Sequence, residues 1–135
     1  MLAITAGAEI RRYWDRVADL GCCVCQGVPA TIHHVHGGSC SGLSGMGMKT
    51  NDWLVIPLCM THHTGDRGID SGQGIFRSVS AWEDANGWQL AHLINVAMIL
   101  RVDIFERARV DLHRLWCSGF SRVASRPPSN TPTFH

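Results

Sequence analysis

The sequence predicts a small α+β domain with one N-terminal helix, two short strands in the middle third and further helices towards the C-terminus. Three observations lead to this prediction. Apolar residues recur every three to four positions between residues 8 and 20, and again between residues 88 and 116. Two short β-prone segments lie between these regions. Two close pairs of cysteine and histidine residues surround the β-prone segments, which indicates that a bound metal ion supplements the core.

The composition sets limits on the class of protein. The 135 residues suffice for one domain, and a net charge of +1 predicts no general basic surface for nucleic acid. No apolar run approaches the roughly 18–20 residues of a membrane span, and the N-terminus lacks the pattern of a signal peptide. We therefore expect a cytoplasmic protein with no membrane partner. In a reducing cytoplasm, six cysteines favour metal binding over disulfides.

The first predicted element is an amphipathic helix over roughly Ala8–Leu20 that stops at Gly21. The apolar side chains of its buried face are Ile10, Trp14, Val17 and Leu20. A cysteine-rich turn follows, too short and too interrupted for a second helix. This turn is expected to lead directly into the first strand.

The middle third is expected to form a hairpin followed by a short helix. The first strand is predicted around Ala30–Val35, and the apolar, β-prone segment Trp53–Leu58 is predicted to be the second. The glycine-rich segment 37–49 between them is predicted to be a loop. A short helix is predicted from Met60 to about Arg67.

The second half is expected to add helical bulk to the domain. One or two helices are predicted before a break at Gly87, and Trp88–Trp116 is predicted to form one long helix or two stacked ones. The predicted domain covers residues 1–117, with its core over about 20–75 and a helical extension over about 76–117. Residues 118–135 are rich in Pro, Ser and Thr and are predicted to be a disordered tail.

Two pairs of residues have the spacing of a structural zinc site. Cys22 and Cys25 form a CxxC pair, and Cys59 and His62 form a CxxH pair further along the chain. Each pair can supply two corners of a tetrahedron around Zn²⁺. Cys23 could replace Cys22 as the first ligand, although the two-residue gap favours Cys22. The competing interpretation is that these are scattered cysteines of the core.

A second group of histidines lies between the two pairs, with His33 and His34 adjacent on the predicted first strand. Adjacent strand residues point to opposite faces, so the two imidazoles cannot have the same role. A metal ligand beside a general base is the arrangement that characterises HNH nucleases.

The segment from Leu20 to Asp70 carries a specific resemblance. The string LGCCVC…IHHVHG…GMGMKTNDWLVIPLCMTHHTGDRGID is similar to phage and prophage HNH proteins related to the Ref recombination-enhancement nuclease. The resemblance implies a ββα-metal (HNH) core with a structural zinc knuckle, flanked by the N-terminal helix and the C-terminal helices. It also implies hydrolysis of DNA phosphodiester bonds in a bacterial host cell, leaving 5′-phosphate and 3′-hydroxyl ends.

The resemblance assigns roles to four residues. His33 and His63 become ligands of a catalytic metal, and His34 becomes the general base. Asp70 occupies the position of a third histidine in many relatives, although Asp66 lies in the same stretch. An Asp oxygen suits Mg²⁺ or Mn²⁺, so we expect one of these, or another divalent ion, as the catalytic metal.

Supporting roles remain open between several residues. The asparagine that gives the HNH motif its name has no unambiguous counterpart, and the resemblance points to Asn51 or Asp52 as the residue that orients the His34 loop. The cationic candidates near the scissile phosphate are Lys49, Arg67 and Arg77.

Three functions follow as hypotheses. The first is a DNA endonuclease that uses one divalent metal and a histidine base. The second is the same nuclease, silent until a recombinase filament or another phage or host DNA-processing protein presents the DNA, because little net charge would hold DNA poorly. The third is a non-catalytic, zinc-stabilised module that binds DNA or protein and does not require His33, His34, His63 and Asp70 to converge.

Overall fold

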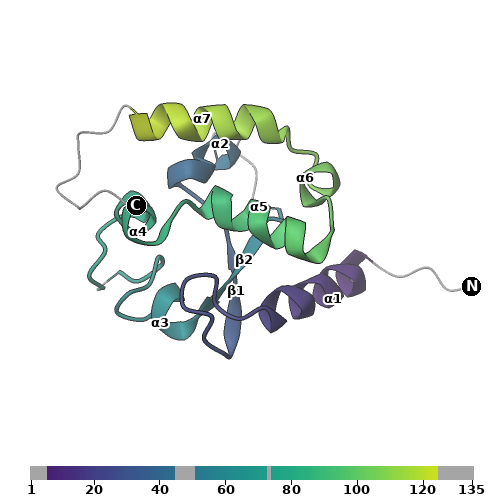
Figure 1. The fold of residues 1–135 in the computed structure, drawn as a ribbon, viewed down its shortest axis with the longest axis horizontal. Helices are drawn as coiled ribbons and strands as arrows, with labels where there is room; N and C mark the ends of the chain where they lie inside the picture. The colour runs from purple at the N-terminus through teal and green to yellow at the C-terminus, as the bar shows by residue number, and fades with distance from the viewer. Residues whose placement is uncertain (1–5, 45–50, 73, 125–135) are drawn as a thin grey trace, which may run out of the picture.

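A computed structural model of the chain describes residues 6–44, 51–72 and 74–124. Its elements are α1 (Ala6–Asp19), β1 (Ala30–His34), the 3₁₀ helix η1 (Gly38–Cys40), α2 (Ser41–Ser44), β2 (Val55–Cys59), α3 (Met60–His63), α4 (Val79–Asn86), α5 (Gln89–Leu100), α6 (Ile104–Arg107) and α7 (Leu112–Ala124). The protein is a mixed α+β chain with a two-stranded sheet at its centre and helices around it (Figure 1). None of the helices in the described ranges has both the length and the apolar character needed to cross a membrane.

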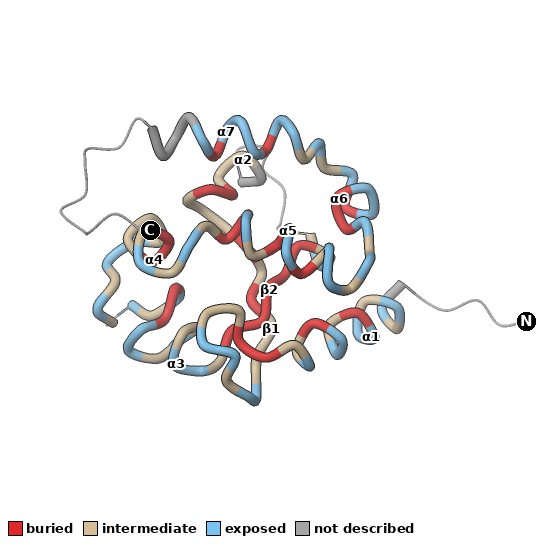
Figure 2. The backbone as a smooth tube through the Cα atoms, viewed as in Figure 1, coloured by how far each residue is buried: buried red, intermediate tan, exposed pale blue. Residues whose placement is uncertain are grey.

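The central sheet is an antiparallel pair in which Ala30 faces Cys59 and His34 faces Val55. An isolated two-stranded sheet is only marginally stable in water, so its faces must be covered. Helices α1 and α5 pack against it, and Figure 2 shows buried residues along β2 and the adjoining part of α5. The sheet is therefore held within the core rather than at its edge.

The second strand begins two residues later than the sequence predicts and includes Cys59. The reason is a turn at Asn51. Its side-chain Oδ1 accepts a hydrogen bond from the Trp53 amide at 2.9 Å, and its carbonyl accepts one from the Leu54 amide at 2.9 Å. Both residues are thereby held in the turn, and pairing with β1 starts at Val55.

The two connections around β2 differ from the prediction in detail. The glycine-rich segment is not simply a loop, since it contains η1 and α2; residues 45–50 lie outside the described ranges. Helix α3 is shorter than expected and ends at His63. The amides of Thr64 and Gly65 both donate to the Met60 carbonyl, at 3.0 and 2.7 Å, and this closes the helix after one turn.

The C-terminal half divides into more helices than predicted. The break at Gly87 is confirmed, with φ at 94°, but the region expected to hold one or two helices contains α5, α6 and the start of α7. Arg101 and Arg109 adopt left-handed conformations, with φ of 55° and 57°, which interrupt the helical path. Asp103 then caps α6, and its Oδ1 accepts from the Glu106 amide at 3.0 Å.

The prediction of a disordered tail is wrong for residues 118–124. Helix α7 continues through residues 118–124, which were expected to be disordered, because Leu115 and the turn around Gly119 pack against the body of the protein. Residues 125–135, the rest of the predicted tail, lie outside the described ranges.

A single cluster of buried apolar residues joins the sheet to the helices. Its largest fully buried apolar side chains are Trp82, Leu54, Ile56, Leu58, Leu90, Leu93 and Ile104. Burying a side chain of this size stabilises the fold by roughly 1.5–3 kcal/mol. This core fixes β1, β2 and α5 relative to one another, and the residues at the ends of these elements build the sites described next.

Candidate metal centres

The first candidate centre joins the turn after α1 to the end of β2. Cys22 and Cys25 come from the turn, Cys59 ends β2, and His62 lies in α3; one donor atom of each lies within 4.8 Å of the others. Cys25 Sγ is 3.8 Å from Cys59 Sγ, and Cys22 Sγ is 3.7 Å from His62 Nδ1. The predicted zinc ligands are thus brought together.

The distances suit a tetrahedral ion. With Zn–S near 2.3 Å and Zn–N near 2.0 Å, neighbouring corners of a zinc tetrahedron are about 3.5–3.8 Å apart. The contact between Cys59 Sγ and His62 Nδ1, at 3.2 Å, is the one shorter edge among those measured. The donor set of three sulfurs and one imidazole is that of structural zinc. The cluster could hold a metal ion such as zinc.

Two of the four residues have pKa shifts that suit a metal, whereas burial and hydrogen bonds with Cys59 and Cys22 raise the pKa of Cys25. Burial raises the pKa of Cys22, but backbone hydrogen bonds at Cys59, Cys25 and Val24 outweigh it and bring the pKa below its usual value. Burial also lowers the pKa of His62, with a further contribution from the positive charge of Arg67. A thiolate and a neutral imidazole are the forms that ligate metals.

The structure distinguishes the two adjacent cysteines by which side chain faces the other metal donors. Cys23 is not part of the cluster; it packs against the apolar core, and its amide donates to the Pro57 carbonyl at 2.9 Å. Burial raises the pKa of Cys23 to about 12, so the group remains a thiol. Cys22 is the residue that faces the other donors.

The second candidate centre includes the α3 residue next to His62. His33 comes from β1, His63 from α3 and Asp70 from the loop that follows, and one donor atom of each lies within 4.8 Å of the others. Asp70 Oδ2 is 3.0 Å from His33 Nδ1 and 3.1 Å from His63 Nε2. These two distances are close to the roughly 3 Å between adjacent ligand atoms of an octahedral ion, so the three residues could hold a metal ion.

Asp70 reaches this centre because the chain turns back sharply on α3. The Ile69 amide donates to the His62 carbonyl at 3.1 Å, and the Asp70 amide donates to the His63 carbonyl at 2.9 Å. Gly68 permits this close approach, since a Cβ there would lie 2.5 Å from the His63 carbonyl oxygen. Asp66, the alternative ligand in the sequence, is not in the cluster.

The electrostatics of the centre depend on the Asp70 carboxylate. Burial alone would raise its pKa, but hydrogen bonds with His33, His36 and His63 hold the pKa far below its usual range. A carboxylate that stays ionised in a ring of imidazoles provides a fixed negative charge. This is the charge that a divalent cation requires.

His36 is a neighbour of this centre to which the sequence analysis assigns no role. Its Nε2 is 2.7 Å from Asp70 Oδ1, and its ring centroid is 5.3 Å from that of His33. The hydrogen bond with Asp70 raises the pKa of His36 above its usual value. Strand alternation would direct His36 to the face of His34, but β1 ends at His34 and the chain then changes direction.

His34 points elsewhere and is not among the three clustered donors. Its side chain is 38% exposed, and its Nε2 is 2.9 Å from Asp52 Oδ1. Trp14 packs edge-on against the His34 ring at 5.6 Å and donates from Nε1 to the Asp52 carbonyl at 2.8 Å. Of the two candidates for orienting His34, Asp52 is therefore the one in contact, while Asn51 makes the turn before β2.

Among the described residues, no side-chain hydrogen bond or ion pair joins a predicted cationic residue to this cluster. Arg67 and Arg77 are exposed on the loop after α3, and Lys49 lies outside the described residues.

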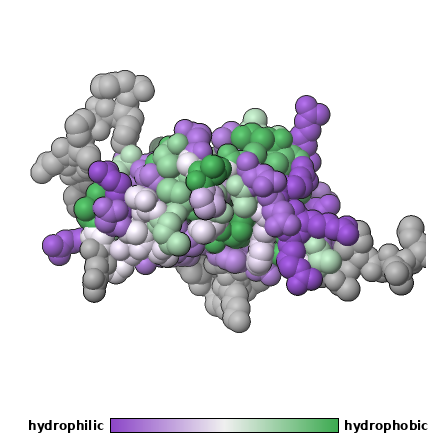
Figure 3. Space-filling view, turned by 90° about the horizontal axis from the view of Figure 1, so that it is seen from below, coloured by the Kyte–Doolittle hydropathy of each residue, from purple (hydrophilic) through white to green (hydrophobic). Residues whose placement is uncertain are grey.

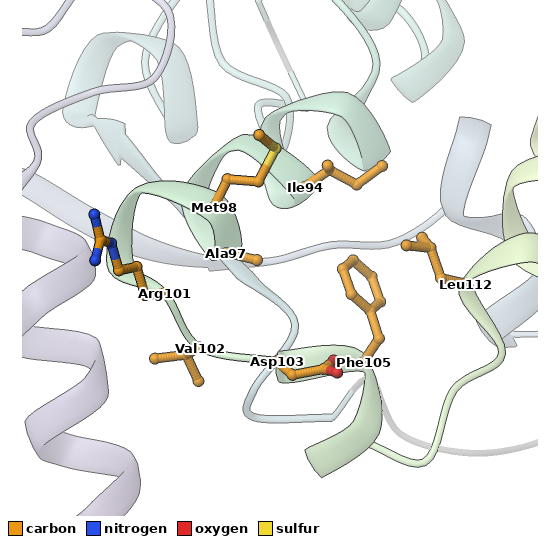
Figure 4. Close-up of a pocket in the computed structure, with 8 residues that line it drawn as sticks. All are labelled: Ile94, Ala97, Met98, Arg101, Val102, Asp103, Phe105 and Leu112. Carbon is orange, nitrogen blue, oxygen red and sulfur yellow. The ribbon is translucent and has the colours of Figure 1, made fainter.

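An apolar pocket lies apart from both centres, between α5, α6 and the start of α7 (Figure 4). It is lined by Ile94, Ala97, Met98, Arg101, Val102, Asp103, Phe105 and Leu112. With one carboxylate in its lining, it does not offer the donor set of a metal site.

Comparison with known proteins gives one match. Residues 6–100 match a family described as "Protein of unknown function (DUF968)", and this region contains both candidate centres. No curated protein and no solved structure matches the chain. Because the match covers more than half of the sequence, the chain belongs to the DUF968 family.

Proposed function

We propose that this protein is a metal-dependent DNA endonuclease of the HNH (ββα-metal) type, with a separate structural zinc site. The observation that carries the proposal is the arrangement around β1, β2 and α3. His33 from β1 and His63 from α3, the helix that follows β2, meet at the Asp70 carboxylate. The preceding residue of α3, His62, joins the three cysteines instead.

The residues of the second centre suit phosphodiester chemistry. Two imidazoles and one carboxylate form a ligand set for Mg²⁺, Mn²⁺ or another divalent ion. Such an ion, when bound, neutralises the negative charge that develops on a phosphodiester during hydrolysis. Asp70 is only partly buried, with 31% of its side chain exposed, so a DNA phosphate can approach the centre.

His34 is the proposed general base. The Asp52 carboxylate accepts a hydrogen bond from His34 Nε2–H, and this leaves Nδ1 of the neutral imidazole free to accept a proton from water. Trp14 holds the ring from one side. His36 is the alternative base, because it lies directly beside Asp70.

DNA binding is expected to need assistance. Seen from below, hydrophilic side chains gather at the end of the molecule that carries α1 (Figure 3). Exposed Arg11, Arg12 and Arg16 alternate there with acidic Glu9 and Asp15, so this helix is not a uniformly basic surface. Since phosphate neutralisation supplies most non-specific affinity, we propose that a recombinase filament or another DNA-processing protein presents the DNA.

The test is cleavage of plasmid and single-stranded DNA with Mg²⁺, Mn²⁺ or Zn²⁺, with wild type beside His34→Ala and His36→Ala. Loss of the base should lower the rate by about 10²–10⁴-fold. The account predicts this loss for His34→Ala, with zinc content and circular dichroism unchanged. The same loss in His36→Ala alone would transfer the role of base to His36.

The competing function is a zinc-stabilised module that binds DNA or a protein partner without catalysis. It would retain the Cys22, Cys25, Cys59 and His62 site and would have no use for the second cluster. Absence of cleavage with every metal, both alone and with a recombinase filament, would favour this module and contradict the nuclease.

A further inference from the structure

The hydroxyl of Thr31 determines which nitrogen of His63 carries a proton. Thr31 Oγ1 donates its single hydrogen to the Leu58 carbonyl at 2.8 Å. The same oxygen lies 2.7 Å from His63 Nδ1, and toward that nitrogen it can only accept. Nδ1 of His63 therefore carries the proton. In the neutral ring, Nε2 then has a free lone pair, and Nε2 is the atom 3.1 Å from Asp70 Oδ2.

Gln89 determines the tautomer of His33 in the same way. The Gln89 amide is oriented by the backbone of His36, because its Oε1 accepts from the His36 amide at 3.1 Å and its Nε2 donates to the His36 carbonyl at 2.7 Å. Since Oε1 is an acceptor, His33 Nε2 at 2.9 Å must donate to it. The lone pair of the neutral ring is thus on Nδ1, which lies 3.0 Å from Asp70 Oδ2.

A buried carboxylate holds Gln89 in place. Glu83 is 2% exposed and accepts from the Gln89 amide at 2.8 Å, from the Ser39 amide at 2.8 Å and from the Ser39 hydroxyl at 2.6 Å. These bonds compensate the cost of burying the charge. They connect α4, α5 and η1 to the imidazole of His33 through Gln89.

The outcome is three acceptors directed at one point. In neutral rings, His33 Nδ1 and His63 Nε2 direct lone pairs at Asp70 Oδ2, whereas protons on these two nitrogens form the hydrogen bonds to Asp70 described above. A metal ion can take the place of those protons. A divalent cation satisfies all three acceptors at once.

We propose that Thr31 and Gln89 are positioning residues, which fix the tautomers of His63 and His33 so that both free lone pairs face Asp70 as ligands for a divalent cation. This inference rests on the metal site of the proposed function. It assigns a role to two residues that lie outside both donor clusters. Outer hydrogen-bond partners of this kind typically contribute about 10–100-fold to metal affinity.

The experiment uses the full chain with one structural zinc bound and measures Mn²⁺ binding by calorimetry and electron paramagnetic resonance, without DNA. Thr31→Val keeps the β-branched shape but removes the hydroxyl, and it should weaken Mn²⁺ binding about 10–100-fold. Thr31→Ser restores the hydroxyl and should bind within about threefold of wild type. Thr31 is the better probe because replacing Gln89 would also leave the His36 backbone unpaired.

A second readout is independent of the metal. The ¹⁵N shifts of the His63 ring, in protein without Mn²⁺, should show a proton on Nδ1 in wild type and Thr31→Ser, and a changed tautomer population in Thr31→Val. Equal Mn²⁺ affinity for Thr31→Val and wild type, or a wild-type His63 ring with a proton on Nε2 and none on Nδ1, would overturn the positioning role alone. Absence of Mn²⁺ binding by wild type would overturn the metal site, and the proposed function with it.

Discussion

His33 and Asp70 are 37 positions apart in the sequence, yet His33 Nδ1 lies 3.0 Å from Asp70 Oδ2. His33 belongs to β1 and Asp70 to the loop after α3, so this contact connects the first strand directly to the chain segment that follows α3. His63, which lies between them in the sequence, contacts the same oxygen at 3.1 Å. A single carboxylate oxygen thus serves two imidazoles from different elements, and this relationship carries the functional proposal.

The zinc site can be tested with two adjacent cysteines. Structural zinc contributes about 10–16 kcal/mol of apparent binding free energy in zinc-finger peptides, which matches or exceeds the stability of most domains. We expect Cys22→Ala to purify without stoichiometric zinc and to lose the cooperative thermal transition. Elemental analysis and circular dichroism measure both properties.

Cys23→Ala is the matched control for that experiment. Cys23 packs against the core and is not a ligand, so its truncation should retain one zinc and lower stability by about 1 kcal/mol, as typical point mutations do. If the two variants behaved alike, the assignment of Cys22 as the ligand would be wrong.

The environment of Glu83 gives a second prediction. Gly38 has φ of 50°, and a Cβ at this position would overlap Glu83 Oε1. We expect Gly38→Ala to displace the carboxylate from Ser39 and to destabilise the fold by more than about 2 kcal/mol, since it adds strain to an unpaired buried charge. Urea unfolding measures the change.

Gly7→Ala is the corresponding control. Gly7 lies in α1, and a Cβ there meets nothing within 4 Å among the described residues. Because Ala is the better helix former, this variant should be up to about 1 kcal/mol more stable than wild type. Similar stability for the Gly38 and Gly7 variants would show that the contact with Glu83 is unimportant.

Tyr13 gives a prediction about alkaline pH. Its side chain is 3% exposed, its hydroxyl has no hydrogen-bond partner among the described residues, and burial raises its pKa to about 12. The raised pKa means that the folded state binds this proton more tightly than the unfolded state, whose tyrosines have a pKa near 10. Stability from this source is complete below about pH 10 and is lost as pH rises towards 12.

Tyr13→Phe should remove that alkaline loss. At pH 8 the variant should be as stable as wild type or more stable, because an unpaired buried hydroxyl is deleted. In urea unfolding, its advantage over wild type should grow between pH 8 and pH 11. A variant clearly less stable at pH 8 would indicate that the hydroxyl is hydrogen-bonded.

The donors of the first cluster could be predicted from the sequence by residue type and spacing, whereas His33, His63 and Asp70 were assigned through the family resemblance. Cys22, Cys25, Cys59 and His62 form close pairs, and His63 is adjacent to His62. The strands were predictable within two residues, since their apolar, β-prone runs are short and bounded by turn residues.

Other features depend on contacts that spacing does not encode. The division of residues 89–124 into three helices follows from left-handed conformations at two arginines, and arginine is not a residue type that predicts such a break. The closeness of His36 to Asp70 depends on where β1 ends. No sequence feature indicated a role for Gln89, because its role comes from side-chain hydrogen bonds with the backbone of His36, which is distant in the sequence.

The central claim is that Asp70 organises a catalytic metal centre for cutting DNA, and its most direct test compares two aspartates of one loop. The measurement is the plasmid cleavage rate with Mg²⁺ or Mn²⁺, with a recombinase filament supplied, for wild type, Asp70→Asn and Asp66→Asn. We predict metal-dependent cleavage by wild type, a loss of at least about 10²-fold in Asp70→Asn, and near wild-type rates in Asp66→Asn. Equal rates for the two variants, or no cleavage by wild type, would contradict the account.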